Sequence, residues 1–169
     1  MARMKADPDG HGVKRADIII EAIVENLEIK QNLFQKLEKE IKPGAVLATN
    51  TSSLPLEEIA SGLEDEGRLI GLHFFNPVAQ MPLVEVIGSE KSREDEIRKG
   101  CAFVTKIKKY PLIAKSCKGF LVNRVLAPYM MEAVRQLENG VPPEKIDQAA
   151  LDFGMPMGPI ELQDMVGLD

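Results

Sequence analysis

Tryptophan is absent from this sequence of 169 residues, and cysteine occurs only twice, at Cys101 and Cys117. Two cysteines are too few for a disulfide-stapled scaffold or a zinc cluster, and they suit a reducing compartment. The chain also lacks any run of about 18 apolar residues, which argues against a membrane-spanning helix. The first twelve residues are polar, include Pro8 and two glycines, and lack the apolar centre of a secretory signal, so we expect a loop there.

An excess of positive charge is absent as well. Lys and Arg number 21 against 26 Asp and Glu, which gives a formal net charge of −5. Because nucleic-acid affinity depends largely on clustered Lys and Arg, this balance argues against a nucleic-acid-binding protein. Hydrophobic residues make up 44% and charged residues 28% of the chain, which is typical of a soluble globular protein rather than a disordered one.

Apolar runs alternate with helical patterns over the first part of the chain. Three runs predict strands, at residues 16–24, 45–49 and 68–75. Between the first two, Phe34, Leu37 and Ile41 recur at helical spacing after a suitable cap at Asn26, and residues 54–61 form a brief helical pattern. The first run contains three adjacent isoleucines, which is typical of a strand buried on both faces. This alternation predicts an α/β fold with a parallel sheet.

Three more elements are expected before residue 117. Residues 82–88 alternate between apolar and polar side chains and predict a strand that turns back on the previous one. Ser92 and Asp95 have the spacing of a helix start, and the helix is followed by a final predicted strand at residues 110–115.

From Gly119 onward the pattern is only helical. One helix is predicted as far as Asn139, and a second begins near Pro143 and ends at Gly154. The remaining residues are punctuated by Gly and Pro, and we predict no further element there. We therefore expect one domain over residues 1–117 and another over residues 118–169.

Polar side chains follow each of the first three predicted strands. Ligands bind beyond the carboxyl ends of the strands in an open parallel sheet, so these residues are candidates for a site. His73 is the natural general base, because histidine exchanges protons near neutral pH. If the chain folds back near Ala79, Glu85 lies opposite His73, where a carboxylate would fix the tautomer of the ring. The candidates are Glu25 and Asn26, Asn50 to Ser53, and His73 to Asn76.

Each of these residues also has a structural explanation. A single histidine at a strand end is more often a structural group than a catalytic one. Ser52 and Asn50 could simply cap the short helix that follows them. Glu85 in an apolar strand is harder to explain, since burying a carboxylate without a partner costs several kcal/mol. It needs a cation or a hydrogen-bond donor nearby.

Several segments of the chain resemble one enzyme family in their order and spacing. They are ADIIIEAIVEN, TNTSS, HFFNPV followed by LVEVI, GFLVNR, FGMPMGP and DMVGLD. They are similar to segments of the 3-hydroxyacyl-CoA dehydrogenases over nearly the whole chain. The resemblance implies NAD-dependent oxidation of an (S)-3-hydroxyacyl-CoA to the 3-ketoacyl-CoA in fatty-acid β-oxidation. It also implies the C-terminal half of a Rossmann-type domain in residues 1–117 and the start of an all-α domain in residues 118–169.

The resemblance also implies roles for individual residues. His73 matches the general base, Glu85 matches its carboxylate partner, and Asn76 matches the amide beside the base. Ser52 and Asn123 match residues that hydrogen-bond the substrate near its reacting carbon. The implied cofactor is NAD, the implied substrate is an acyl-CoA, and no metal is implied. The positions implied for contact with the cofactor are Glu25, Lys30, Asn50, Ser52 and Ala22.

The sequence lacks the phosphate-binding turn of a dinucleotide-binding domain. Such a domain opens with a strand, a G-x-G-x-x-G turn and a helix, whereas Gly10 and Gly12 follow no predicted strand. We therefore expect the chain to lack roughly the first three strands of the family's domain. The 169 residues alone should bind NAD weakly or not at all and should be inactive. The first predicted strand would then be an apolar open edge, which favours a homo-oligomer formed through that edge or through the helical segment.

The kind of parent protein is also suggested by the resemblance. The segments KIKKYPLIAKSCKGFLVNR and GVPPEKID look more like the dehydrogenase region of a multifunctional β-oxidation alpha subunit than like a stand-alone enzyme. This implies a thiolase subunit as a partner and the bacterial cytoplasm as the location, with the mitochondrial matrix as the alternative. The competing interpretation is a non-catalytic structural or interaction relative of the same superfamily. Retention of His73, Glu85, Ser52 and Asn123 argues against it.

Overall fold

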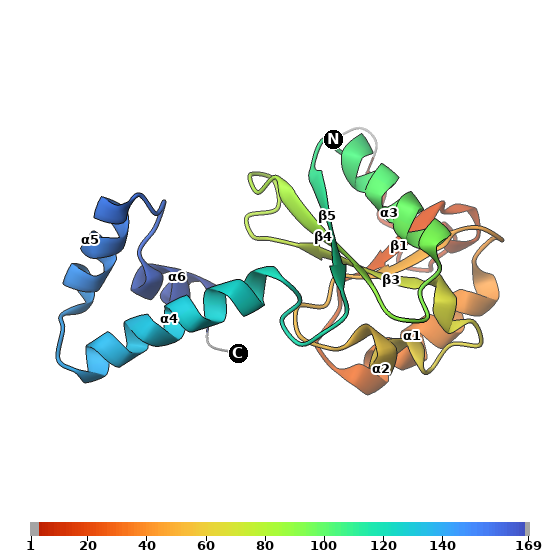
Figure 1. Cartoon of the computed structure of the whole chain (residues 1–169). Helices are drawn as coiled ribbons and strands as arrows, with labels where there is room; N and C mark the ends of the chain where they lie inside the picture. The colour runs from red at the N-terminus through yellow and green to blue at the C-terminus, as the bar shows by residue number, and fades with distance from the viewer. Residues whose placement is uncertain (1–3, 168–169) are drawn as a thin grey trace. The chain divides into compact units, whose positions relative to one another are not determined.

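The computed structural model describes residues 4–167, which form two compact units. The first unit, Met1–Phe120, contains a five-stranded sheet with helices on both faces, and the described residues of the second unit, Leu121–Asp169, form helices (Figure 1). The division falls three residues beyond the domain boundary expected at residue 117.

The sheet of the first unit is mostly parallel. Its strands lie in the order β1-β2-β3-β4-β5, with β3 and β4 antiparallel and the other neighbouring pairs parallel. The predicted α/β fold and the predicted return of the chain at residues 82–88 are therefore confirmed. A short loop permits this return, because a parallel partner needs a long crossover. The strands are β1 (Ile18–Glu21), β2 (Val46–Thr49), β3 (Leu69–Phe74), β4 (Leu83–Gly88) and β5 (Tyr110–Lys115).

Helices cover both faces of this sheet (Figure 1). On one face, α1 and α2 share a core with strand residues such as Leu47 and Leu69, and on the other face α3 shares a core with Ile70 and Leu72. Because successive strand residues point to opposite faces, His73 lies on the same face as Leu69. The helices of this unit are α1 (Leu27–Glu40), α2 (Leu56–Ala60) and α3 (Glu94–Lys106), with short 3-10 helices at Val13–Arg15 and Glu66–Arg68.

Strand β1 is shorter and more exposed than predicted. It ends at Glu21 rather than Val24, and Ile18 to Ile20 are only partly buried. The prediction of a strand buried on both faces is wrong because β1 lies at the edge of the sheet. Among the described strands, β2 is the one neighbour of β1.

The start of α3 also differs from the prediction. The spacing of Ser92 and Asp95 predicted a side-chain cap, but Arg93 occupies the N-cap position and makes no cap hydrogen bond with its side chain. The Ser92 hydroxyl instead donates to the carbonyl oxygen of Leu69 over 2.7 Å. Ser92 therefore ties the start of α3 to β3.

The helical unit contains one helix that the sequence analysis missed. The two predicted helices correspond to α4 (Val122–Glu138) and α5 (Pro143–Phe153), and the missed helix is α6 (Pro159–Val166). The carboxylate of Asp147 in α5 accepts hydrogen bonds from the backbone N–H groups of Ile160 and Glu161 at the start of α6. Gly158 is required beside this cap, since a Cβ atom there would lie 2.2 Å from Cγ of Asp147.

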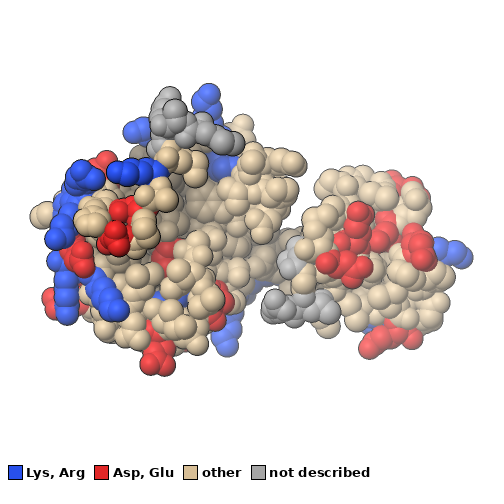
Figure 2. Space-filling view, turned by 180° about the vertical axis from the view of Figure 1, so that it is seen from behind, with Lys and Arg blue, Asp and Glu red and all other residues tan. Residues whose placement is uncertain are grey.

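The net charge of the chain is carried by the helical unit. Residues 121–169 contain three basic and eight acidic residues, whereas residues 1–120 contain eighteen of each sign. Figure 2 shows acidic side chains gathered on one face of the helical unit, while both signs are interspersed on the first unit. None of the helices in the described part of the chain combines the length and apolar character needed to span a bilayer.

Candidate active site

The antiparallel pairing of β3 and β4 brings His73 and Glu85 together. The two residues are direct partners in the register, and Nδ1 of His73 lies 2.7 Å from Oε2 of Glu85. Residues directly opposite in such a pair point to the same face of the sheet, so their side chains meet. The predicted proximity of His73 and Glu85 is therefore observed.

This pair is almost completely removed from solvent. His73 is 6% exposed and Glu85 is 0% exposed, and the imidazole packs against the rings of Phe75 and Phe120 with centroid distances of 4.6 and 5.6 Å. A carboxylate at Nδ1 favours the tautomer that carries its proton there and leaves Nε2 as the acceptor. Within residues 4–167, no hydrogen bond of the protein engages Nε2. The arrangement is suited to general acid–base chemistry.

Phe120 is a part of this site that the sequence analysis did not identify. It lies 47 positions after His73, is 1% exposed, and has a positive φ of 46°, which is uncommon for a residue other than glycine. Its backbone N–H donates to the carbonyl oxygen of Cys117, which closes a tight turn after β5. The turn carries the ring back onto the imidazole, a contact for which the sequence offers only Gly119 as a turn signal.

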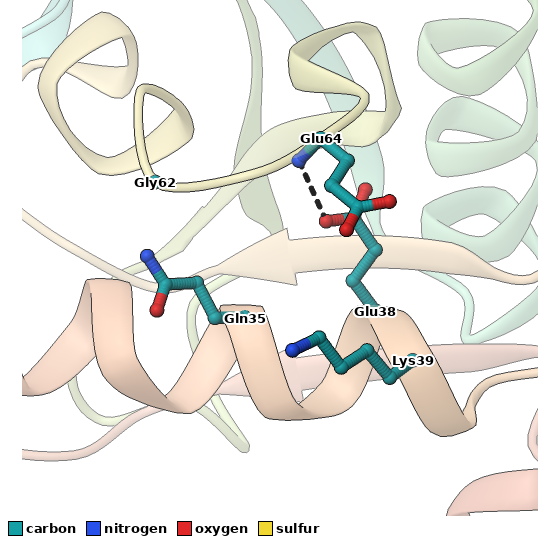
Figure 3. Close-up of a pocket in the computed structure, with 5 residues that line it drawn as sticks. All are labelled: Gln35, Glu38, Lys39, Gly62 and Glu64. Atoms are coloured by element: carbon teal, nitrogen blue, oxygen red, sulfur yellow. Dashed lines mark hydrogen bonds between the residues drawn. The ribbon is translucent and has the colours of Figure 1, made fainter.

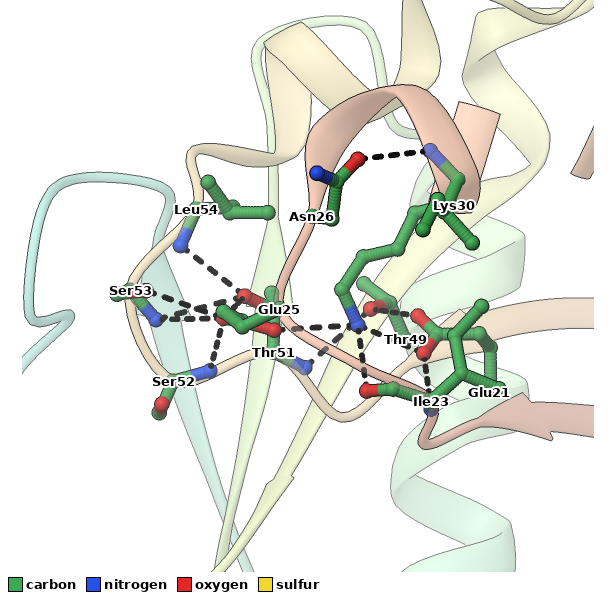
Figure 4. Close-up of polar contacts among 11 residues, drawn as sticks. Glu21, Ile23, Glu25, Asn26, Lys30, Thr49, Thr51, Ser52, Ser53 and Leu54 are labelled. Carbon is green, nitrogen blue, oxygen red and sulfur yellow. Dashed lines mark hydrogen bonds and ion pairs between the residues drawn. The ribbon is translucent and has the colours of Figure 1, made fainter. Parts of the chain in front are cut away.

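A second polar cluster lies at the carboxyl ends of β1 and β2 (Figure 4). The ammonium of Lys30 in α1 lies 2.7 Å from Oε1 of Glu21 and 3.1 Å from Oε2 of Glu25. The side chains of Glu21 and Lys30 are 0% and 1% exposed, whereas that of Glu25 is 36% exposed. The hydroxyl of Thr49 donates to Oε2 of Glu21 over 2.7 Å. This cluster thus joins two strands and a helix.

Glu25 binds the loop that follows β2 (Figure 4). Its Oε1 accepts hydrogen bonds from the backbone N–H groups of Ser52 and Ser53 at 3.2 and 3.3 Å, and from the hydroxyls of Ser53 and Thr51. Partial burial raises the pKa of Glu25, but the hydrogen bond from Thr51 and the ammonium of Lys30 outweigh it and lower the pKa from 4.5 to about 2. Glu25 is therefore ionised throughout the neutral range.

The lowered pKa of Glu25 predicts a specific loss of stability in acid. Since folding lowers this pKa, ionised Glu25 stabilises the fold above pH 4.5, and this contribution is lost as the pH falls from 4.5 toward about 2. The Glu25→Gln variant should therefore lose less stability than the wild type over that window. Urea unfolding followed by circular dichroism at about pH 6, 4.5 and 3 measures the difference. A parallel decline in both proteins would contradict the prediction.

The structure does not support the alternative that Ser52 and Asn50 cap the short helix. Pro55 is the N-cap of α2, and the backbone N–H of Leu56 donates to the hydroxyl of Ser116. Oδ1 of Asn50 instead accepts a hydrogen bond from the backbone N–H of Phe74 over 3.0 Å. The Ser52 hydroxyl points away from the cluster in Figure 4, and it makes no hydrogen bond within the described residues. It is therefore available to a ligand.

The remaining predicted site residues lie on exposed positions. Ala22 follows β1, and Asn76 follows β3 and precedes Pro77, to which it is joined by a cis peptide bond. Asn123 lies in the first turn of α4, in the second unit. The structure therefore forms two groups of predicted site residues. His73 contacts Glu85, and Glu25 contacts Lys30, Thr51, Ser52 and Ser53. Asn123 belongs to the second unit.

A shallow pocket of about 210 Å³ lies elsewhere on the first unit, between α1 and the turn after α2 (Figure 3). Glu38 at its wall accepts a hydrogen bond from the backbone N–H of Glu64 over 2.8 Å, so its carboxylate has a structural function. Gln35, Lys39 and Gly62 complete the lining, and none of the predicted site residues belongs to it. Over residues 4–167, no group of three or more His, Cys, Asp and Glu side chains could hold a metal ion.

Two family models cover almost the whole chain. Residues 1–117 match the model described as 3-hydroxyacyl-CoA dehydrogenase, NAD binding domain, and residues 119–169 match the model described as 3-hydroxyacyl-CoA dehydrogenase, C-terminal domain. Over 158 residues the chain is 48% identical to the fatty acid oxidation complex subunit alpha of Vibrio cholerae, which covers 94% of this chain and 22% of the relative. The chain spans less than a quarter of the length of the curated relatives that it matches.

Solved structures of 3-hydroxybutyryl-CoA dehydrogenases are also similar to this chain. The (S)-3-hydroxybutyryl-CoA dehydrogenase of Ralstonia eutropha has a TM-score of 0.93 and 36% identity, covering 99% of this chain and 60% of that one. The 3-hydroxybutyryl-CoA dehydrogenase of Escherichia coli has a TM-score of 0.88 and 43% identity, covering 94% of this chain and 34% of that one. The likeness therefore extends over both units of the chain.

Proposed function

The chain belongs to the 3-hydroxyacyl-CoA dehydrogenase family, and on that premise we propose that the full-length protein containing it oxidises (S)-3-hydroxyacyl-CoA to 3-ketoacyl-CoA with NAD. The observation that carries this proposal is the buried contact between His73 and Glu85, which leaves one imidazole nitrogen as a proton acceptor. The names of the relatives, a fatty acid oxidation complex subunit and 3-hydroxybutyryl-CoA dehydrogenases, support fatty-acid β-oxidation as the pathway.

In the proposed reaction, His73 is the general base. Its Nε2 accepts the proton of the 3-hydroxyl group while the C3–H bond breaks, and the oxygen's electron pair forms the new carbonyl bond. NAD supplies the acceptor for the hydride that leaves C3. Glu85 holds the ring through Nδ1, and its negative charge stabilises the imidazolium that forms. The proton then passes from the ring to solvent.

The residues at the carboxyl ends of β1 and β2 would contact the nicotinamide of NAD and the ribose beside it. Glu25 is a partly exposed carboxylate that can accept hydrogen bonds from hydroxyl groups, and Ala22 is exposed and small. The amide N–H groups of Asn50 have no protein acceptor within the described residues. Lys30 is buried behind Glu25 and would act through that carboxylate.

Three polar residues would contact the substrate. Ser52 presents an exposed hydroxyl with no hydrogen bond in the described part of the chain, and Asn76 is exposed two residues after the end of β3. Asn123 is exposed on α4. Hydroxyl and amide groups of this kind can bind the oxygen atoms near C3 and hold the carbon for hydride transfer.

An assay of the reverse reaction tests the proposed function. The full-length protein should oxidise NADH in the presence of acetoacetyl-CoA, followed by the fall in NADH absorbance. Turnover with acetoacetyl-CoA but not with free acetoacetate would support an acyl-CoA substrate. Absence of turnover in the pure, folded protein would contradict the proposal and favour a non-catalytic relative.

We also propose that the 169-residue chain forms a homo-oligomer. Among the described strands, β1 has one neighbour, so its outer edge carries backbone groups that a second chain could pair with. The partly buried isoleucines of β1 add apolar surface at that edge. Light scattering at micromolar concentration should give a mass above the 18.7 kDa of one chain. A mass of 18.7 kDa would contradict the proposal.

The remaining proposals concern the partner subunit and the cellular location of the full-length protein. The curated relatives are named as alpha subunits of a fatty acid oxidation complex, and this name supports a further subunit as a partner. We propose that this subunit is a thiolase. Their bacterial origin supports the bacterial cytoplasm as the location. Copurification of a thiolase with the full-length protein would test the partner.

A further inference from the structure

The ring of Phe120 lies against the imidazole of His73, with a centroid distance of 5.6 Å and an interplanar angle of 59°. We propose that Phe120 is a positioning residue: its ring fixes the plane of the imidazole and keeps water away from the hydrogen bond between His73 and Glu85. This role rests on the function proposed above, in which His73 is the general base. It requires that the hydrogen bond alone leaves the imidazole free to tilt, and that the chain holds Phe120 in place.

The hydrogen bond to Glu85 does not fix the imidazole by itself. The torsion that turns a histidine ring about its Cβ–Cγ bond has broad energy wells. The contact of 2.7 Å holds Nδ1 of His73, but a single bond at that atom tolerates a tilt that moves Nε2 on the far side of the ring. Because Nε2 is the proposed proton acceptor, neighbouring side chains must supply the missing restraint.

Two aromatic rings supply this restraint. Among the described residues, the rings that contact the imidazole of His73 are those of Phe75, with a centroid distance of 4.6 Å, and Phe120. Both contacts are tilted and lie in the range of about 4.5 to 7 Å that aromatic pairs prefer. Phe75 is half-buried, whereas Phe120 is 1% exposed. Phe120 is therefore the contact that closes the pair to water.

The backbone of Phe120 adopts a conformation that favours glycine. Its φ is 46°, directly after Gly119 with a φ of 73°. A residue with a Cβ atom pays free energy in this left-handed region, whereas a second glycine would adopt it readily. A residue held in such a conformation points to a function that requires its side chain. Here that side chain is the ring beside His73.

Short-range hydrogen bonds hold this conformation and connect it to the sheet. The backbone N–H of Phe120 donates to the carbonyl oxygen of Cys117 over 3.0 Å, and the thiol of Cys117 donates to the carbonyl oxygen of Phe120 over 3.4 Å. Just before this turn, the backbone N–H of Ser116 donates to the carbonyl oxygen of Gly88 over 2.9 Å. Gly88 ends β4, the strand that carries Glu85. The ring and the carboxylate are thus anchored to the same strand.

Core packing alone does not require an aromatic ring at this position. The hydrophobic core that includes Phe120 consists mainly of aliphatic side chains, such as Leu56, Leu69 and Ile87. A leucine in place of Phe120 would still bury apolar surface there. It would offer no flat ring to the imidazole, and its smaller volume would leave room for water beside Nδ1 and Oε2. Such water would compete for Glu85 and let the proton leave Nδ1.

The experiment compares two phenylalanine-to-leucine variants of the full-length protein. Phe120→Leu removes the ring beside His73, and Phe34→Leu is the matched control, because Phe34 is 0% exposed and belongs to the same core. The kcat for acetoacetyl-CoA reduction should fall by about tenfold or more in Phe120→Leu, because small misplacements of a reacting group cost this much. The KM values should change by less than about twofold. Phe34→Leu should keep wild-type kcat although it also lowers the thermal midpoint.

A conservative substitution separates positioning from stability. Phe120→Tyr keeps the ring but buries a hydroxyl group, so its kcat should stay within about threefold of the wild type even where its thermal midpoint falls. A kcat for Phe120→Leu within about threefold of the wild type, or equal losses in Phe120→Leu and Phe34→Leu, would overturn the proposal. If thermal unfolding shows that Phe120→Leu does not fold, Phe120→Met takes its place in the same measurements.

NMR of the protein labelled with ¹⁵N-histidine gives a measurement that does not depend on turnover. The signal of the proton on Nδ1 of His73 is assigned by its absence in His73→Gln, and saturation transfer from water measures its exchange. This exchange should be at least about tenfold faster in Phe120→Leu than in the wild type and unchanged in Phe34→Leu. Equal exchange in all three proteins would overturn the proposal. If the wild type lacks dehydrogenase activity, the proposed function fails, while the exchange rates still decide whether Phe120 shields the pair.

Discussion

Replacing His73 with glutamine in the full-length protein should lower kcat for dehydrogenation by about 10²- to 10⁴-fold, the usual contribution of a general base. Glutamine has a similar size, and its amide N–H can still donate to Glu85, so the buried carboxylate keeps a partner. The amide cannot accept the proton of the 3-hydroxyl group. The KM values for acyl-CoA and NAD should change little, because the substitution removes proton transfer rather than binding.

The control for this prediction is the other histidine of the chain. His11 is exposed and lies in the loop before β1, so His11→Gln should retain wild-type kcat. Steady-state kinetics of NADH oxidation with acetoacetyl-CoA measure both variants, and circular dichroism checks that both are folded. A kcat for His73→Gln within about threefold of the wild type would remove His73 from the role of base.

Replacing Glu85 with glutamine should lower kcat by about 10²-fold or more, since a neutral partner both fails to stabilise the imidazolium and permits the wrong tautomer. If the amide donates to Nδ1, the proton of the ring moves to Nε2, which then cannot accept the substrate's proton. The distance of 2.7 Å between Nδ1 and Oε2 makes this tautomer effect direct. The loss should appear in kcat and not in NAD affinity.

Glu96 supplies the matched control for Glu85. It is also a buried carboxylate, 4% exposed, but it lies in α3 and pairs with Lys99 over 3.0 Å, so it shares the burial of Glu85 without contact to His73. Glu96→Gln should keep wild-type kcat even if it lowers the thermal midpoint. Equal losses of kcat in the two variants would mean that Glu85 acts only through stability.

The sequence predicts the sheet well because its strands are short apolar runs separated by clear helix signals. All five strands were expected, and β5 has the bounds that were predicted. The prediction extended β1 to Val24 because residues 22–24 are apolar. The parallel pairing of β1 with β2 nevertheless ends at Glu21. Helix α6 was missed because Gly and Pro were taken as breakers, whereas the cap that starts this helix comes from Asp147, a contact between distant residues.

The candidate site was predictable where local pairing sets it. His73 and Glu85 are separated by a single hairpin, so their contact follows from strand register. The ion pair of Glu21 and Lys30 was not identified, because a lysine in a helix is normally solvated. A signal was present, since Lys30, Phe34 and Leu37 share one face of α1, and a lysine on an apolar face needs a buried acid.

The ladder between β3 and β4, rather than the connecting loop, fixes the catalytic geometry. A one-residue shift in the register of β4 against β3 would turn Glu85 to the opposite face of the sheet, next to α3, and would separate it from the imidazole. Insertions or deletions confined to residues 77–81, after the proposed substrate contact Asn76, would leave that ladder intact. This segment can therefore be exchanged between homologues of different substrate preference, as a graft that leaves the acid–base pair in place.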